Sequence, residues 1–241
     1  MNTRARWFTG IALAAAAAVW WWIDADRTHF LPAEEPAFIS QFAAPSAPDS
    51  AQTRNELARL LSLQQSRSDA DVAAARADRK TELRRFYGAL GLDADNPPDL
   101  PQLERLAERV EDDVRIHVRH VKEHFRRLRP YEIEPRLKPC IDNVRGDLSY
   151  PSGHAAYAWS MAYLLESMVP ERKPALEARA TEFARQRMVC GVHFPSDLAA
   201  GKQAAEWLLK EMRLHPEFSM EAAAAAAELR GALGLPLASQ R

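Results

Sequence analysis

From residue 50 onward, apolar and polar residues follow one another with the spacing of amphipathic helices. Glycine is sparse, and leucine, valine and alanine recur three or four residues apart, which is the period of one helix face. The pattern predicts helices over residues 52–65, 69–90, 103–128, 153–168, 174–188, 195–214 and 221–230. No run alternates in the manner of a β-strand. We therefore predict an all-α protein, with a single-domain helical bundle over residues 50–241.

Two segments interrupt this helical pattern. Residues 26–49 contain four prolines among small residues and are predicted to form an extended linker along the surface. Residues 131–150 contain Pro135, Pro139 and Gly146 and are predicted to form a loop between two helices.

Residues 1–25 have the pattern of an export segment. Two arginines precede an uncharged run from residue 7 to residue 23, and two aspartates follow it. This order is typical of a secretory signal and predicts that the chain after it is exported. The run is at the short limit for a membrane-spanning helix, which needs about 17–25 residues. A cleaved signal peptide and an uncleaved inner-membrane anchor both remain open, and we predict a periplasmic protein in either case.

Composition and charge narrow the classes of partner. Apolar residues make up 47% and charged residues 27% of the chain, as in folded globular domains. A formal net charge of −1 provides no general attraction to nucleic acid or to an acidic membrane. We predict no nucleic-acid binding, and membrane contact only through residues 1–25 if they are retained. The sequence does not decide between a monomer and a homo-oligomer.

Two cysteines, Cys140 and Cys190, are present. An even number in an exported protein is consistent with one disulfide, and two free buried thiols are the alternative. A bond would connect the loop before residue 153 to the turn before residue 193.

Lys122 lies near the end of the predicted helix over residues 103–128, and Arg129 follows that helix directly. Its valines form one apolar stripe, and these two cations, seven residues apart, border that stripe. Cations beside a buried face need an anion. On this helix alone, a solvated lysine and an ion-paired arginine are the favoured explanation.

The same helix carries His117, His120 and His124 on one face. Their spacing could hold a metal such as zinc. The three histidines lie roughly opposite the Lys122 and Arg129 edge on the helical wheel, and we interpret them as a solvated polar face.

The stretch Pro151-Ser152-Gly153-His154 leads directly into an apolar helix. Ser152 can cap that helix, and Gly153 lets a ligand approach the backbone. The unpaired N–H groups of a helix N-terminus favour a phosphate, which would lie beside His154. An ordinary N-cap with an exposed histidine is the simpler alternative.

Arg187 ends the predicted helix over residues 174–188, and residues 190–192 form a turn before His193. Asp197 follows four residues later, after a proline that suits the first turn of a helix. Its carboxylate can accept the imidazole N–H and leave the other ring nitrogen free to attack. A local His–Asp capping interaction is the alternative here.

In this order, the motifs K-x6-R-P, P-S-G-H and R-x5-H-x3-D resemble the signature of the type 2 phosphatidic acid phosphatase superfamily. The segments SYPSGHAAYAW and QRMVCGVHFPSDLAAG resemble the class A bacterial nonspecific acid phosphatases, which are exported, soluble and all-helical. The resemblance is strongest from Lys122 to Gly201. It implies a helical bundle of the type 2 phosphatidic acid phosphatase and haloperoxidase type.

The resemblance implies a role for each matched residue. His193 would be the nucleophile that forms a phosphohistidine, Asp197 would orient it, and His154 would be the general acid. The phosphoryl oxygens would be held by Lys122, Arg129, Ser152, Gly153 and Arg187. No metal or other cofactor is implied.

These roles predict a metal-independent acid phosphatase acting on small phosphate monoesters. Two alternatives are a membrane-associated lipid phosphate phosphatase and a vanadate-dependent haloperoxidase. A non-enzymatic helical scaffold would be expected to lack some of the catalytic residues.

Overall fold

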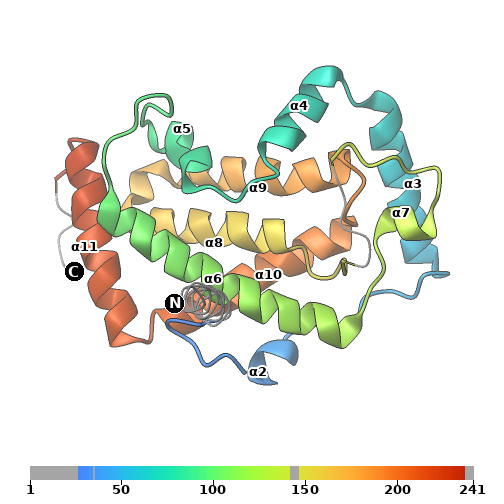
Figure 1. Ribbon diagram of the computed structural model, residues 1–241, viewed down its shortest axis with the longest axis horizontal. Helices are drawn as coiled ribbons and strands as arrows, with labels where there is room; N and C mark the ends of the chain where they lie inside the picture. The colour runs from blue at the N-terminus through green and yellow to red at the C-terminus, as the bar shows by residue number, and fades with distance from the viewer. Residues whose placement is uncertain (1–26, 35, 142–146, 237–241) are drawn as a thin grey trace, which may run out of the picture.

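The computed structural model describes residues 27–34, 36–141 and 147–236, and all regular secondary structure within them is helical (Figure 1). The predicted all-α fold class is therefore confirmed. The predicted export segment lies outside the described residues. Within the part that is described, no helix is both long and apolar enough to cross a membrane.

Helix α8 (Gly153–Met168) is the centre of the bundle, because it is apolar on every side and must be surrounded. It packs between α9 (Lys173–Val189) and α10 (Pro195–Met212), and α6 (Pro101–Phe125) crosses it (Figure 1). Helix α11 (Pro216–Ala232) packs against α6 and α8. Figure 1 shows α11 at the end of the bundle away from the start of α8.

Shorter elements complete the bundle, and Figure 1 shows α3, α4 and α7 gathered near the end where α8 begins. Their bounds are α2 (Pro36–Ile39), α3 (Ala51–Ser66), α4 (Asp69–Ala77), η1 (Leu83–Phe86), α5 (Tyr87–Leu90), α7 (Pro130–Ile133) and η2 (Pro170–Arg172).

Two predicted helices are shorter in the structure. The helix predicted over residues 69–90 is divided into α4, η1 and α5, with irregular chain from Asp78 to Glu82. The helix predicted over residues 103–128 ends at Phe125, because Arg126 adopts a left-handed conformation with φ of 50°. A residue in this conformation commonly ends a helix, and α7 begins soon afterwards at Pro130.

The segment predicted to be a surface linker instead contributes to the main core. Phe30, Leu31, Phe38 and Phe42 are all buried in it. The fully buried carboxylate of Asp113 accepts the backbone N–H groups of residues 29, 30 and 31 at 2.6, 2.9 and 3.0 Å. The segment also contains α2, which begins at Pro36, so its chain is irregular only in part, and it carries aromatic anchors.

The same segment corrects the interpretation of the histidine face on α6. His117 is 1% exposed, and its ring nitrogens lie 2.7 Å from the Asp113 carbonyl oxygen and 2.9 Å from that of Pro32. It is therefore part of the interior, whereas His124 is exposed. In the described residues, no group of three or more His, Cys, Asp or Glu side chains is arranged to hold a metal ion.

Helices α8 and α10 approach most tightly at Gly201. A Cβ at this position would lie 2.6 Å from the Ser152 carbonyl oxygen and 2.7 Å from the Ala155 Cβ. Only glycine allows the first turn of α8 to lie this close to α10.

Candidate active site

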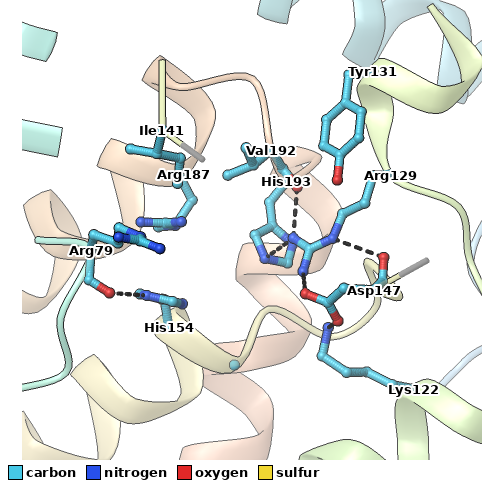
Figure 2. A pocket seen from close by; sticks show the side chains of 11 residues that line it. Arg79, Lys122, Arg129, Tyr131, Ile141, Asp147, His154, Arg187, Val192 and His193 are labelled. Carbon is cyan, nitrogen blue, oxygen red and sulfur yellow. Dashed lines mark hydrogen bonds and ion pairs between the residues drawn. The ribbon is translucent and has the colours of Figure 1, made fainter. Parts of the chain in front are cut away.

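A cavity of about 250 Å³ opens where α8 begins (Figure 2). Six residues singled out in the sequence line it: Lys122, Arg129, Gly153, His154, Arg187 and His193. Five others complete the wall: Arg79, Tyr131, Ile141, Asp147 and Val192. Ser152 and Asp197 are fully buried behind this lining.

Lys122 and Arg129 meet in the cavity for a reason other than the one predicted. Lys122 is in the last turn of α6, but Arg129 is the N-cap residue of α7, beyond the end of α6. They therefore do not share a helix edge. The left-handed turn at Arg126 redirects the chain and brings the guanidinium back beside the lysine.

Hydrogen bonds on both sides of the ring fix the tautomer of His193. Its Nδ1 lies 3.3 Å from Oδ2 of Asp197, and its Nε2 lies 2.5 Å from Nη1 of Arg129. A carboxylate can only accept and a guanidinium can only donate. The proton is therefore on Nδ1, and the lone pair is on Nε2, facing the cavity. Burial, followed by the charge of Arg129, lowers the pKa of His193 well below its usual value, which keeps the ring neutral.

Asp197 is held by groups that the sequence reading did not single out. Arg127 donates to Oδ1 at 2.7 Å, while Oδ2 accepts from the Ser149 hydroxyl at 2.5 Å and the Phe194 N–H at 2.9 Å. Burial raises the pKa of Asp197, and these donors act in the opposite direction.

Arg127 in turn connects Asp197 to Glu56 on α3. It donates to Glu56 Oε2 at 3.0 Å and lies 3.9 Å from the centre of the Phe194 ring. The other Glu56 oxygen accepts the Ser196 N–H at 2.8 Å. This buried chain of alternating charges sets the position of the aspartate, because a charge in the interior is retained where it is paired and hydrogen-bonded.

The first turn of α8 forms the floor of the cavity. Ser152 caps the helix by accepting the Ala155 N–H at 3.3 Å. Gly153 leaves the backbone open to the cavity. His154 follows, and its Nε2 lies 2.8 Å from the Arg79 carbonyl oxygen. Because a carbonyl only accepts, Nε2 carries a proton and Nδ1 is the remaining nitrogen. Burial and then Arg187 lower the pKa of His154 to about 3.

The cavity has an excess of positive charge. Arg187 is 4% exposed, and its Nε and Nη1 have no hydrogen-bond partner among the described residues. Burial, together with Arg129, lowers the pKa of Arg187 to about 10 and that of Lys122 to about 8. Buried donors without partners are costly, so this arrangement favours an incoming oxyanion.

Asp147 is an acidic residue of the cavity wall that the motifs did not indicate. Its carboxylate forms an ion pair with Arg129 and lies 3.8 Å from the Lys122 Nζ. The neighbouring Leu148 carbonyl accepts from Lys122. Both cations are thus held by acceptors of the chain itself.

A disulfide joins Cys140 to Cys190, with the two Cα atoms 4.8 Å apart. It connects the loop that carries Ile141 to the turn that carries Val192, and both of these side chains line the cavity. Arg76 also donates to the Cys140 carbonyl at 3.0 Å. The bond therefore braces two parts of one wall.

Comparisons with known proteins agree with this architecture. A model of the PAP2 superfamily matches residues 115–208. The chain is 29% identical over 162 residues to a non-specific acid phosphatase of Providencia stuartii, an alignment covering 66% of this chain and 63% of that protein. It is 34% identical over 111 residues to a non-specific acid phosphatase of Salmonella typhi, covering 45% and 44%.

The chain thus spans less than two thirds of the length of these curated relatives. A crystal structure of a bacterial vanadium-dependent iodoperoxidase has a similar fold, with a TM-score of 0.54 and 17% identity, covering 78% of this chain and 53% of that one. The resemblance inferred from the three motifs is confirmed, as is the helical fold that it implied.

Proposed function

We propose, from the match of residues 115–208 to the PAP2 superfamily, that the protein is an exported, metal-independent acid phosphatase. It hydrolyses small phosphate monoesters through a phosphohistidine on His193. The observation that carries the proposal is the pair of hydrogen bonds that leaves the His193 Nε2 lone pair facing a cavity rich in cations.

Phosphate binding is the first step. The phosphoryl oxygens occupy the cationic wall formed by Lys122, Arg129 and Arg187, with the Gly153 backbone and the capped start of α8 below them. The oxygens take the N–H groups of Arg129 away from His193 and Asp147. They also supply acceptors for the two Arg187 nitrogens that have no partner among the described residues.

Nucleophilic attack follows once Nε2 is released. The lone pair forms an N–P bond while the bond from phosphorus to the ester oxygen breaks in line. The Nδ1 proton stays on His193, where Asp197 stabilises the positive charge that develops on the ring. Arg127 and Glu56 act through Asp197, since they hold its carboxylate in place.

His154 protonates the leaving alcohol from Nδ1, because its Nε2 proton is engaged by Arg79. Because its pKa is lowered to about 3, the ring is neutral before phosphate binds. A monoanionic phosphate ester brings a proton of its own, with a second pKa near 6. Its negative charge also favours the imidazolium form of His154. Acidic solution therefore supplies the form of substrate that this site needs.

Hydrolysis of the phosphohistidine completes the cycle. Water replaces the alcohol beside His154, which now accepts a proton from it as the N–P bond breaks. Phosphate leaves, and Arg129 returns to the His193 Nε2.

The proposal is tested with a chromogenic phosphate monoester in the presence of a chelator, with vanadate as an inhibitor. Wild-type protein should hydrolyse the ester at acidic pH, and His193→Ala should show no turnover. Protein quenched in alkaline denaturant, where an N–P bond survives, should carry phosphate on a histidine. Loss of wild-type activity on chelation would contradict the metal-free mechanism.

The general acid is tested by varying the leaving group. His154→Ala should slow esters of alkyl alcohols far more than esters of nitrophenol, whose anion leaves without a proton. An equal loss for both would remove His154 from that role. Peroxide-dependent oxidation of halide by vanadate-loaded protein would favour the haloperoxidase alternative, and hydrolysis confined to phosphatidate would favour the lipid phosphatase alternative.

A further inference from the structure

Besides the phosphate-binding groups, each side of the cavity carries one further charged residue, and these two residues differ in sign. Figure 2 shows Asp147 on the same side as Lys122 and Arg129, and Arg79 on the other side with His154 and Arg187. Arg79 belongs to none of the motifs discussed above, so its position calls for an explanation of its own.

The backbone of Arg79 is fixed at two points. Its carbonyl oxygen accepts the Nε2 proton of His154 at 2.8 Å. The preceding residue, Asp78, is buried and forms two hydrogen bonds with Arg179 of α9, at 2.9 and 2.5 Å. Helix α4 ends at Ala77, so the Arg79 carbonyl lies outside the helix and can accept from the His154 side chain.

The side chain of Arg79 is exposed at the cavity and close to Arg187. It lines the same cavity, and its positive charge contributes to the lowered pKa of Arg187. Two guanidinium groups close together repel each other, and an anion between or beside them relieves that repulsion. Arg187 also has two buried nitrogens without a partner in the described structure.

The direction of the reaction determines which part of a substrate Arg79 meets. In an in-line displacement, the nucleophile and the leaving group are on opposite sides of phosphorus. The nucleophile is His193 Nε2, beside Arg129, and the leaving alcohol departs towards His154. Because the Arg79 carbonyl contacts His154 directly, its side chain starts from the leaving-group side of the site.

We propose that Arg79 is a specificity-determining residue that binds a second anionic group carried by the leaving alcohol. The inference rests on the proposed phosphatase function and names its substrate class: phosphate monoesters of alcohols that bear a carboxylate. A guanidinium matches a carboxylate through two parallel hydrogen bonds. Because the side chain is exposed, the gain is modest, corresponding to a preference of about fivefold to tenfold.

The test compares two substrates that differ only in the group of interest. Glycerol 3-phosphate and 3-phosphoglycerate have leaving groups of three carbons, and the second carries a carboxylate in place of a hydroxymethyl group. The ratio of kcat/KM for 3-phosphoglycerate to that for glycerol 3-phosphate is measured for wild type, Arg79→Gln and Arg79→Glu. Lys80→Gln is the matched control, since Lys80 is the next residue, is exposed and does not line the cavity.

Arg79→Gln should lower this ratio about fivefold to tenfold, through the KM for 3-phosphoglycerate. Arg79→Glu should lower it further, and Lys80→Gln should leave it at the wild-type value. An unchanged ratio in both Arg79 variants would overturn the inference. So would an equal loss on both substrates, because Arg79 would then act on the transferred phosphoryl group. Failure of the wild type to hydrolyse any monoester would instead refute the proposed function.

Discussion

The close approach of α8 and α10 at Gly201 leads to a specific prediction for Gly201→Ala. The new Cβ would lie 2.6 Å from the Ser152 carbonyl oxygen, 2.7 Å from the Ala155 Cβ and 3.0 Å from the Ala156 nitrogen. Two of these atoms belong to the backbone and cannot rotate away. The helices must therefore separate by several tenths of an ångström.

The expected cost in stability is that of overpacking a well-filled core, about 1–3 kcal/mol. For a chain of this size, that corresponds to a decrease in Tm of roughly 3–10 °C. Gly231→Ala is the matched control, because it is also in a helix, and a Cβ there meets nothing within 4 Å. Alanine is the better helix former, so this variant should gain about 0.5–1 kcal/mol.

The effect on catalysis should exceed the effect on folding. Asp197 lies one turn before Gly201 on α10, and its carbonyl accepts the Ser152 N–H at 3.0 Å. Separation of the helices would displace the floor of the cavity relative to the nucleophile. Misplacement of reacting groups by about 1 Å can cost 100-fold in rate, so a smaller shift should lower kcat/KM by roughly 10-fold.

Thermal unfolding and steady-state kinetics on a chromogenic ester measure the two effects together. A Gly201→Ala protein with the Tm and kcat/KM of the wild type would refute the argument from helix approach. Loss of stability with unchanged kcat/KM would refute its catalytic part.

Three further predictions concern charge and cross-linking. The kcat/KM profile should fall above about pH 8. The pKa of Lys122 is lowered to about 8, so above this pH the side chain loses the charge that binds phosphate. An active Lys122→Arg variant should not show this fall. Asp147→Asn should lower the inhibition constant for inorganic phosphate about threefold to tenfold, because a competing carboxylate is removed from Arg129 and Lys122; weaker inhibition would contradict this. Reduction of the Cys140–Cys190 disulfide, which spans 50 residues, should lower the free energy of unfolding by about 4 kcal/mol, as measured by urea denaturation with and without reductant.

The sequence identified six of the residues that line the cavity, but it missed Arg79 and Asp147 and did not explain how the six meet. Lys122 and Arg129 were placed on one helix edge by a periodicity that continues to Leu128. A left-handed residue at Arg126 ends the helix early, and a non-glycine residue in this conformation has no reliable signal in a single sequence. Both cations nevertheless line the same cavity.

Groups that act through distant partners could not be read from the chain. Arg127 and Glu56 are 71 residues apart, and their ion pair exists only because α3 packs beside the site. Similarly, helical periodicity placed His117 on a polar face of α6, but residues 29–32 cover its side chain in the structure. Helical periodicity reports which side chains share a face, and it does not report what another segment places on that face.

The contact between Arg129 and the His193 Nε2 has a consequence for chemical selectivity. The lone pair accepts a hydrogen bond from a donor of the protein itself, so the imidazole cannot react until a ligand exchanges hydrogen bonds with Arg129. An electrophile without oxyanion character, such as a carboxylic ester, brings nothing that makes this exchange favourable. On the proposed mechanism, the site would therefore discriminate between electrophiles before any bond forms, without exposing a generally reactive histidine.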